Sequence, residues 1–167
     1  EQAPSIVERR NVRGVAGRID FLGIEHTPLD EEAVRQAARE LVHDMGCEAI
    51  AISFLHSYVN EIHEKRAIDL VRETVPGVEV SAGALLANEY REYERTSTAV
   101  LDAYIKPVLK NYLGRVTDGI ACAGFSGKTY AMNSAGGALT FEMAEAQPIA
   151  TILSGPAGGV SGALHVA

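Results

Sequence analysis

The chain has 167 residues, enough for one domain with a sizeable core or for two small lobes. Its hydrophobic fraction of 47% and charged fraction of 22% are typical of a globular protein, and no apolar run approaches the roughly 20 residues that span a bilayer. Membrane insertion is therefore not expected. The formal net charge of −7 argues against nucleic-acid binding, because affinity for a polyanion requires a basic surface.

The two cysteines, Cys47 and Cys122, lie far apart in the sequence and without CxxC spacing. This arrangement predicts neither a zinc site nor a disulfide framework. It is typical of free thiols in a reducing compartment, so a cytoplasmic protein is expected. The five histidines show no HExxH or other paired metal spacing, and the sequence identifies no metal ligands.

The beginning of the chain predicts a hairpin followed by a helix. Residues 12–20 and 24–29 alternate apolar and polar residues on either side of "FLG", which is the pattern of two short strands. Asp30 then stands where a helix N-cap is expected, and Gly46 stands where a helix ends. Residues 31–45 between them are predicted as a helix with one apolar stripe.

The next segments alternate between strand and helix. Residues 47–54, "CEAIAISF", form a nearly continuous apolar run with the length of a buried parallel strand. Asn60 is placed to cap a helix over residues 61–75, and residues 78–82 predict another strand. The order helix, strand, helix, strand implies a right-handed parallel α/β unit.

From residue 85 the pattern is that of one long helix through residue 116, which Pro107 is expected to kink or break near Lys106. Strands are predicted over residues 128–133 and 149–153, and a short helix lies between them. Each of these strands delivers a glycine-containing loop at its carboxyl end.

The second of these loops, "SGPAGG" at residues 154–159, has the composition of a phosphate-binding turn. In open α/β sheets, ligands bind outside the carboxyl ends of strands, where the following helix offers free amides to an anion. The hydroxyl of Ser154 and the glycines Gly155, Gly158 and Gly159, which permit positive φ, suit that role. The alternative is a structural turn, because the loop matches neither GxGxxG nor a Walker A pattern.

The first loop, "NSAGG" at residues 133–137, has the same capacity for anions, with a tight turn as the alternative. A polar group consisting of Arg91, Glu94, Arg95 and Thr96 begins the long predicted helix. Its spacing also fits a solvated face of ion pairs, which is the alternative to a substrate clamp.

His56 follows the central strand and so lies at its carboxyl end, where a site is expected. The alternative is a hydrogen-bonded structural histidine. No Ser-His-Asp order or nucleophile elbow accompanies it.

Five segments, in this order, resemble the A subunit of the hydantoinase/oxoprolinase family: "PLDEEAVRQAARELV", "AIAISFLHSYVNEIHEKRA", "EYREYERTSTAVLDAYIKPVL", "NSAGGALT" and "ILSGPAGGVSGA". The family includes ATP-dependent N-methylhydantoinases, 5-oxoprolinases and related subunits of acetone and acetophenone carboxylases. The resemblance implies part of an actin-like (ASKHA, ribonuclease H-like) ATPase fold with a parallel or mixed sheet and flanking helices. Residues 1–84 would end the family's N-terminal region, and residues 85–167 would hold the long helix and the start of the ATPase core.

The resemblance further implies that the full-length subunit opens hydantoin or 5-oxoproline-type rings, using ATP and Mg²⁺ to phosphorylate a substrate oxygen. The nucleotide-contacting candidates are Ser154, Gly155, Gly158, Gly159, Asn133, Ser134, Gly136 and Gly137. The catalytic candidates are Arg91, Glu94, Arg95, Thr96 and His56. The family's DxGGT phosphate loops do not occur in this sequence, which predicts an internal fragment that is inactive alone.

The expected partners are a B-type hydantoinase subunit and a small cyclic amide. Two other interpretations stay open. The chain fits equally the ATP-using subunit of an acetone or acetophenone carboxylase, which is a ligase. It also fits a non-catalytic actin-like nucleotide-binding module.

Overall fold

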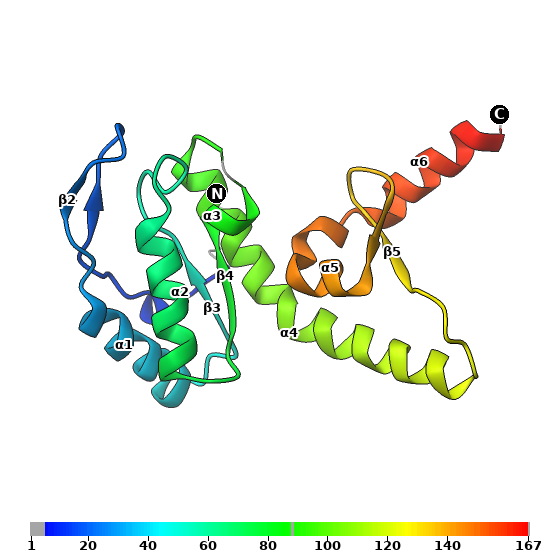
Figure 1. The fold of residues 1–167 in the computed structure, drawn as a ribbon, viewed down its shortest axis with the longest axis horizontal. Coiled ribbons are helices and arrows are strands. Elements are labelled where there is room, and N and C mark those ends of the chain that lie inside the picture. The colour runs from blue at the N-terminus through cyan, green and yellow to red at the C-terminus, as the bar shows by residue number, and fades with distance from the viewer. Residues whose placement is uncertain (1–5, 88, 167) are drawn as a thin grey trace. The chain divides into compact units, whose positions relative to one another are not determined.

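The computed structural model describes residues 6–87 and 89–166 and divides into two compact units, residues 1–104 and residues 105–167 (Figure 1). The boundary lies inside the long helix α4 (Glu92–Cys122), whereas the sequence places a domain boundary between residues 84 and 85. Both units combine helices with a small sheet, so the α/β class is confirmed. None of the helices among the described residues is long and apolar enough to cross a membrane.

The first unit begins with the predicted hairpin, whose strands are shorter than the sequence pattern. Strands β1 (Arg18–Ile19) and β2 (Glu25–Thr27) pair antiparallel. The turn is braced by Asp20, whose Oδ1 accepts hydrogen bonds from the backbone N–H of Leu22 and of Ile24, both at 2.9 Å. Gly23 adopts a φ of 83°, which glycine allows at no steric cost.

Helix α1 (Glu31–Arg39) begins where the sequence predicts. Asp30 caps it, with Oδ1 accepting the N–H of Ala33 at 3.0 Å. The helix then continues as one turn of π-helix, η2 (Glu40–Asp44), which the periodicity does not predict. Gly46 ends the segment with a φ of 69°, as expected of a glycine that closes a helix.

The cap of α1 gives a stability prediction. Asp30→Ala removes the acceptor for the Ala33 N–H, so we expect the free energy of unfolding to fall by about 0.5–2 kcal/mol. Asp118→Ala, at an exposed position inside α4, is the matched control and should change it by less than about 0.5 kcal/mol. Urea unfolding of both variants measures the difference. Equal losses in the two variants would contradict the capping role.

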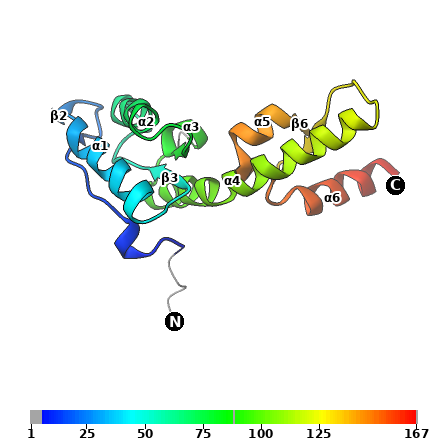
Figure 2. The same cartoon turned by 90° about the horizontal axis from the view of Figure 1, so that it is seen from below.

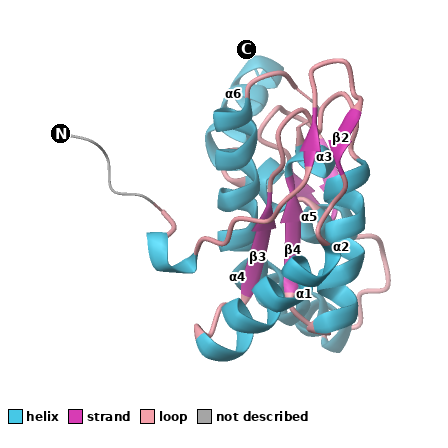
Figure 3. Cartoon of the chain, turned by 90° about the vertical axis from the view of Figure 1, so that its left-hand side faces the viewer, coloured by secondary structure: helices cyan, strands magenta, loops and turns pink. Residues whose placement is uncertain are grey.

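The centre of the first unit is a parallel pair of strands, β3 (Ala49–Ile52) and β4 (Glu79–Ala82), paired from Ala49 opposite Glu79 to Ile52 opposite Ala82 (Figure 3). Both strands are predicted from the sequence. Helix α2 (Ile62–Thr74) connects them, and helix α1 lies alongside it (Figures 1 and 2).

The alternation of side chains along the strands explains what covers each face. One face packs into the core with α1 and α2. The core residues are Val34, Ala38, Ile50, Ile52, Ala67, Ile68, Leu70, Val71, Val75, Val80 and Ala82. On the other face of β4, buried Ser81 donates a hydrogen bond to Asp102 of α4 at 2.6 Å. The first turns of α4 therefore lie on the face opposite to α2, and the short helix α3 (Gly83–Leu86) precedes them.

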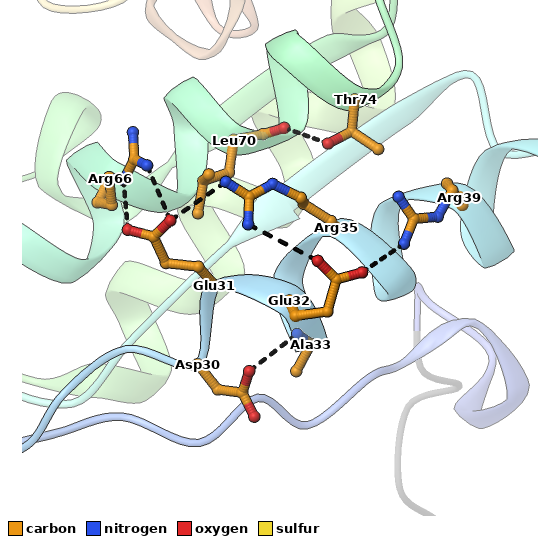
Figure 4. A network of polar contacts seen from close by, with 9 residues as sticks. All are labelled: Asp30, Glu31, Glu32, Ala33, Arg35, Arg39, Arg66, Leu70 and Thr74. Atoms are coloured by element: carbon orange, nitrogen blue, oxygen red, sulfur yellow. Dashed lines mark hydrogen bonds and ion pairs between the residues drawn. The ribbon is translucent and has the colours of Figure 1, made fainter.

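Ion pairs join α1 to α2 at the surface of the first unit (Figure 4). The guanidinium of Arg66 donates two hydrogen bonds to the carboxylate of Glu31, at 2.7 and 2.8 Å. This contact with Arg66 lowers the pKa of Glu31 below its ordinary value of 4.5, and Arg35 adds to the effect. On the neighbouring turns of α1, Glu32 pairs with Arg39 at 2.8 Å.

The direction of the Glu31 pKa shift predicts a pH dependence. A carboxyl group whose pKa is lower in the folded state stabilises the fold above its unfolded pKa, and that contribution is lost as the pH falls through the folded pKa. We therefore expect Arg66→Gln to be less stable than the wild type at pH 7, and the difference to shrink below pH 4.5. Urea midpoints at pH 7 and pH 3 measure it. Arg72→Gln, at an exposed position of the same helix, should show no such convergence.

In the second unit, α4 continues without interruption through Pro107, so the helix does not break near Lys106 as expected. A proline removes only one backbone donor, which leaves the carbonyl of Ala103 without its helical partner while the flanking turns stay paired. The helix also extends to Cys122, beyond the predicted end at residue 116.

The rest of the second unit contains one strand that the sequence does not predict, β6 (Ala138–Thr140). It pairs antiparallel with the predicted strand β5 (Tyr130–Met132), and residues 133–137 form the turn between them. Helix α5 (Phe141–Ala146) follows as predicted, capped by Thr140, whose Oγ1 accepts the N–H of Met143 at 3.3 Å.

The predicted strand over residues 149–153 is wrong. This segment contains the 3₁₀ turn η3 (Pro148–Thr151), and helix α6 (Ser154–Val166) follows. The β-branched residues of the segment suggest a strand, but β5 is paired with its hairpin neighbour β6. The carbonyl of Ala150 instead accepts the N–H of Ser134 at 2.7 Å, and Pro148 suits the first position of a helical turn.

Candidate functional site

The loop that follows β3 is held by two buried, oppositely charged side chains. Glu64 of α2 accepts the N–H of Phe54 at 2.8 Å, and Arg95 of α4 donates to the carbonyl of Phe54 at 2.7 Å. Both polar groups of one backbone residue are thus bonded to ionisable side chains. This fixes the course of residues 53–57 at the carboxyl end of β3, where a ligand site is expected in an α/β unit.

Glu64 is fully buried, with no exposed surface. Its Oε1 also accepts the hydroxyl of Ser57 at 2.7 Å, and its Oε2 accepts the N–H of Ala84 at 2.7 Å. The carboxylate therefore ties the loop after β3 and the start of α3, which follows β4, to α2. Such a buried acid is stable because hydrogen bonds replace its lost hydration.

Arg95 is 1% exposed and enters the same region from the first turns of α4. Its guanidinium lies over the ring of Tyr58, 5.6 Å from the ring centre, and Tyr90 packs edge-on against that ring. Gly83 makes room for the arginine, because a Cβ at residue 83 would lie 2.7 Å from Arg95 Cγ. The arginine is therefore immobilised along its whole length.

His56 and Glu92 lie next to this arginine. The backbone of His56 has a φ of 60°, which is uncommon for a residue other than glycine and often marks a functional site. Its N–H donates to Glu92 Oε1 at 3.3 Å, and its Nδ1 lies 3.8 Å from the same oxygen. Burial acts to raise the pKa of Glu92, but the N–H groups of His56 and of Glu92 itself, with the charge of Arg95, lower it on balance.

The structure brings three of the five catalytic candidates together. His56 and Arg95 meet around Glu92, and the hydroxyl of Thr96 lies 2.6 Å from that of Ser53 in the same loop. Arg91 and Glu94 instead pair with each other at 3.3 Å on the solvent side, with side chains 71% and 57% exposed. For these two, the geometry is that of the solvated ion pair given as the alternative.

Sequence reasoning missed Glu64, Ser57 and Glu92. Glu64 had a detectable signal, since it lies at helical spacing from Ala67, Ile68 and Val71 and so falls on the buried stripe of α2. An acid on an apolar stripe must find buried donors, and its position predicts a polar centre.

The two glycine-rich segments of the second unit lie close together, and the first is the tight turn given as the alternative. Residues 133–137 are a hairpin turn in which Asn133 Oδ1 accepts the N–H of Ala135, and Gly136 and Gly137 have φ values of 89° and 84°. Ser134 Oγ accepts the N–H of Leu153 at 2.9 Å, just before α6 begins.

The "SGPAGG" segment is the first part of helix α6, so the expectation of a loop with positive φ at Gly155, Gly158 and Gly159 is wrong. Gly158 faces β5, since a Cβ there would meet Met132 at 3.4 Å, whereas Gly155 and Gly159 have no neighbour within 4 Å of such a position. The helix propagates because Ser154 and Pro156 suit its first turn.

An open hollow of about 460 Å³ lies elsewhere in the second unit. It contains none of the candidate residues, and it is lined by Thr117, Ile120, Ala121, Phe125, Gly127, Lys128, Thr129, Thr140 and Glu142. Within the described part of the chain, no group of three or more His, Cys, Asp or Glu residues is arranged to hold a metal ion.

Comparison with known proteins assigns both ends of the chain to one family. Residues 3–75 match the hydantoinase/oxoprolinase N-terminal region, and residues 95–167 match hydantoinase/oxoprolinase. The chain belongs to the hydantoinase/oxoprolinase family. The resemblance predicted from its sequence segments is therefore confirmed.

Curated relatives match nearly the whole chain. An uncharacterised protein of Methanocaldococcus jannaschii is 42% identical over 95% of this chain and 23% of the relative. Caprolactamase subunit alpha of Pseudomonas jessenii is 36% identical over 99% of this chain and 24% of the relative. The chain thus spans about a quarter of the length of these curated relatives.

A solved structure supports the fold. The nucleotide-free structure of acetone carboxylase, an enzyme of ATP-dependent acetone carboxylation, matches 99% of this chain and 24% of its own chain, with a TM-score of 0.86 and 34% identity. The small parallel and antiparallel sheets and their helices therefore occur together in a known family structure.

Proposed function

We propose that this chain is part of an ATP-dependent cyclic amidohydrolase subunit that opens hydantoin, 5-oxoproline or similar lactam rings. The observation that carries the proposal is that two hydantoinase/oxoprolinase family matches cover residues 3–75 and 95–167. The caprolactamase relative supports it, since its name denotes the opening of a cyclic amide. The complete subunit would have the actin-like fold, act in the cytoplasm and assemble with a B-type subunit.

The chemistry explains why such an enzyme uses ATP. An amide in a small ring is a poor electrophile at neutral pH, and ATP would supply the phosphoryl group that turns a substrate oxygen into a leaving group. Enzymes contribute to phosphoryl transfer mainly by positioning groups and neutralising charge.

The residues of the second unit fit only part of a nucleotide site. The N-terminus of α6 offers the N–H groups of Ser154 and Gly155, because the first amides of a helix have no intrahelical acceptor. Residues 129–167 contain no Lys or Arg to neutralise phosphate charge, however, and the described residues offer no acidic cluster for Mg²⁺. In this proposal Ser154 and Gly155 form one wall of the site, with Asn133, Ser134, Gly136, Gly137, Gly158 and Gly159 as supporting positions.

For the first unit, we propose that Arg95, Thr96 and His56 serve the reaction at the carboxyl end of β3. Arg95 is buried and supplies a fixed positive charge there, and His56 and Thr96 are partly exposed beside it. Arg91 and Glu94, which are exposed, would instead face the partner subunit.

A second candidate function is the ATP-using subunit of a ketone carboxylase. It is supported by the acetone carboxylase structure, which matches 99% of this chain with 34% identity, as the caprolactamase structure matches 82% with 36% identity. These comparisons leave the two reactions comparably supported, so the substrate must be identified by assay.

The decisive experiment measures ADP release by the intact protein with its partner subunit. The substrates are hydantoin, 5-oxoproline, caprolactam, and acetone with bicarbonate. Stimulation by a cyclic amide, with a ring-opened carboxylate as product, supports the amidohydrolase. Stimulation by acetone and bicarbonate alone supports the carboxylase, and stimulation by none of them overturns both proposals.

A hydroxyl substitution tests the role of the loop after β3. Thr96→Val removes the contact with Ser53 at nearly constant volume, and we expect substrate-stimulated turnover to fall about tenfold, or roughly 1.4 kcal/mol in the barrier. Thr98→Val is the matched control, because the Thr98 hydroxyl only donates to Glu94 O of its own helix at 2.8 Å. Equal turnover in the two variants would exclude a role for Thr96.

A further inference from the structure

Three nitrogen atoms around the N-terminus of α4 face a single carboxylate oxygen, Glu92 Oε1. The N–H of His56 lies 3.3 Å from it, His56 Nδ1 3.8 Å and Arg95 Nη2 4.0 Å. Only the first of these distances is within hydrogen-bonding range, and it is long for an N–H···O bond. The three nitrogens therefore surround a carboxylate that accepts one long hydrogen bond from them.

Two nitrogen atoms in this region lack a hydrogen-bond partner among residues 6–87 and 89–166. They are His56 Nδ1 and Arg95 Nε, and both are buried. Buried polar atoms are normally bonded, so each unpaired atom calls for an explanation. Arg95 is 1% exposed, and its unpaired Nε lies on the side of Gly83, where an added Cβ would be 3.0 Å from it.

The surroundings of the three donors favour an anion. Glu92 is the first residue of α4, a helix of 31 residues, and the N-terminus of a helix attracts negative charge. Arg95 stays fixed without Glu92, because the carbonyl of Phe54 accepts from its Nη2 at 2.7 Å and the carbonyl of Glu89 accepts from its Nη1 at 3.4 Å. The side chain of Glu92 is 30% exposed, so it has a path into solvent.

We propose that His56, Arg95 and the N-terminus of α4 form a carboxylate-binding site that Glu92 occupies when no ligand is bound. An incoming carboxylate displaces the Glu92 side chain into solvent and accepts the hydrogen bonds that Glu92 makes poorly. The internal carboxylate thus blocks the site until a ligand competes for it.

The assigned ligand is a carboxylate because the group already held there is one, with an oxygen that accepts the N–H of His56. The site itself stands on this geometry. The identification of its ligand as the carboxylate that hydrolysis of a cyclic amide releases rests on the proposed function.

The test measures acetate binding to the intact protein by calorimetry, in carboxylate-free buffer and without nucleotide or substrate. Glu92→Ala removes the competing carboxylate, and we expect the Kd for acetate to fall at least tenfold relative to the wild type. Glu94→Ala removes a carboxylate about half a turn further along α4, where Glu94 pairs with exposed Arg91. This variant should leave the Kd for acetate unchanged. Glu92→Gln, which keeps the side-chain length, should give a smaller gain.

The imidazole is tested in the same background. Adding His56→Asn to Glu92→Ala should abolish the gain in affinity, since asparagine tolerates the positive φ but lacks the imidazole ring. Equal acetate affinity in Glu92→Ala and Glu94→Ala would overturn the site. Tighter binding of inorganic phosphate than of acetate to Glu92→Ala would overturn the assignment to a carboxylate.

Acetate binding requires neither ATP nor turnover, so the two proposals fail separately. Loss of the acetate effect with normal turnover of cyclic amides removes only the carboxylate site. Tight acetate binding with no turnover of any cyclic amide removes the proposed reaction and leaves the site standing.

Discussion

Glu64→Ala is expected to lower the free energy of unfolding by about 3–5 kcal/mol, the largest loss among the substitutions considered for this chain. The fully buried carboxylate accepts from the N–H groups of Phe54 and Ala84 and from the hydroxyl of Ser57. Alanine would leave the buried Ser57 hydroxyl and the two partly buried N–H groups without their acceptor. Urea unfolding monitored by circular dichroism measures the loss.

Two companion variants make the test specific. Glu64→Gln keeps one oxygen acceptor but turns an amide N–H₂ toward a donor, so its cost should be intermediate, about 1–3 kcal/mol. Glu61→Ala removes an acid from the exposed start of the same helix, where it pairs with Lys65, and should cost less than about 0.5 kcal/mol. A Glu64→Ala protein as stable as the Glu61→Ala protein would show that the carboxylate does not hold the loops.

Gly83→Ala is expected to destabilise the protein by about 1–3 kcal/mol, because the new methyl group overlaps Arg95. The added Cβ would lie 2.7 Å from Arg95 Cγ and 3.0 Å from Cδ. These atoms lie in the middle of a side chain whose guanidinium is bonded to the Phe54 carbonyl, so the arginine has little freedom to move aside.

The matched control for this substitution is Gly114→Ala in α4. A Cβ at residue 114 meets no atom within 4 Å, so alanine should stabilise the helix by about 0.5–1 kcal/mol. Thermal unfolding of the two variants should therefore show shifts of opposite sign. A stabilising Gly83→Ala would mean that Arg95 is not fixed in the position described.

The elements of the first unit could be predicted because their signals are local. Asp30 and Gly46 mark the limits of one helical segment, and the apolar runs around Ile50 and Val80 have the length and composition of buried strands. A strand with apolar residues on both faces must be covered on both sides, and this requirement predicts the flanking helices.

The strands of the second unit were not all predicted correctly, because tertiary context decides which segments pair as strands. Ile149 and Ile152 have the composition of a strand, but a strand forms only where it pairs with another. Residues 138–140 follow the Gly136–Gly137 turn and pair with β5, whereas residues 148–151 form a 3₁₀ turn that Pro148 begins. Single-segment propensity contains no information about which segment finds such a partner.

The candidate site was predicted in part. The sequence predicts site residues in a histidine after a central strand and an arginine near the start of a long helix. These residues, His56 and Arg95, do lie together around Glu92. The exposed pair Arg91 and Glu94 has the same residue types at the same spacing as the pair Glu92 and Arg95. These residue types alone do not show which of the two arginines is buried. Their catalytic and nucleotide-binding roles stay predictions.

The composition of helix α6 has a consequence for how this segment responds to its surroundings. Its sequence, "SGPAGGVSGALHV", contains four glycines, and none of its residues is buried within the described chain. Each glycine disfavours a helix by about 1 kcal/mol relative to alanine, and an isolated helix of this length is marginal in water. The segment is therefore near the balance point between coil and helix, and its amide hydrogens should be among the first to exchange with solvent. Whatever contacts its N-terminus also sets how much of it is folded, so that binding there is coupled to local ordering.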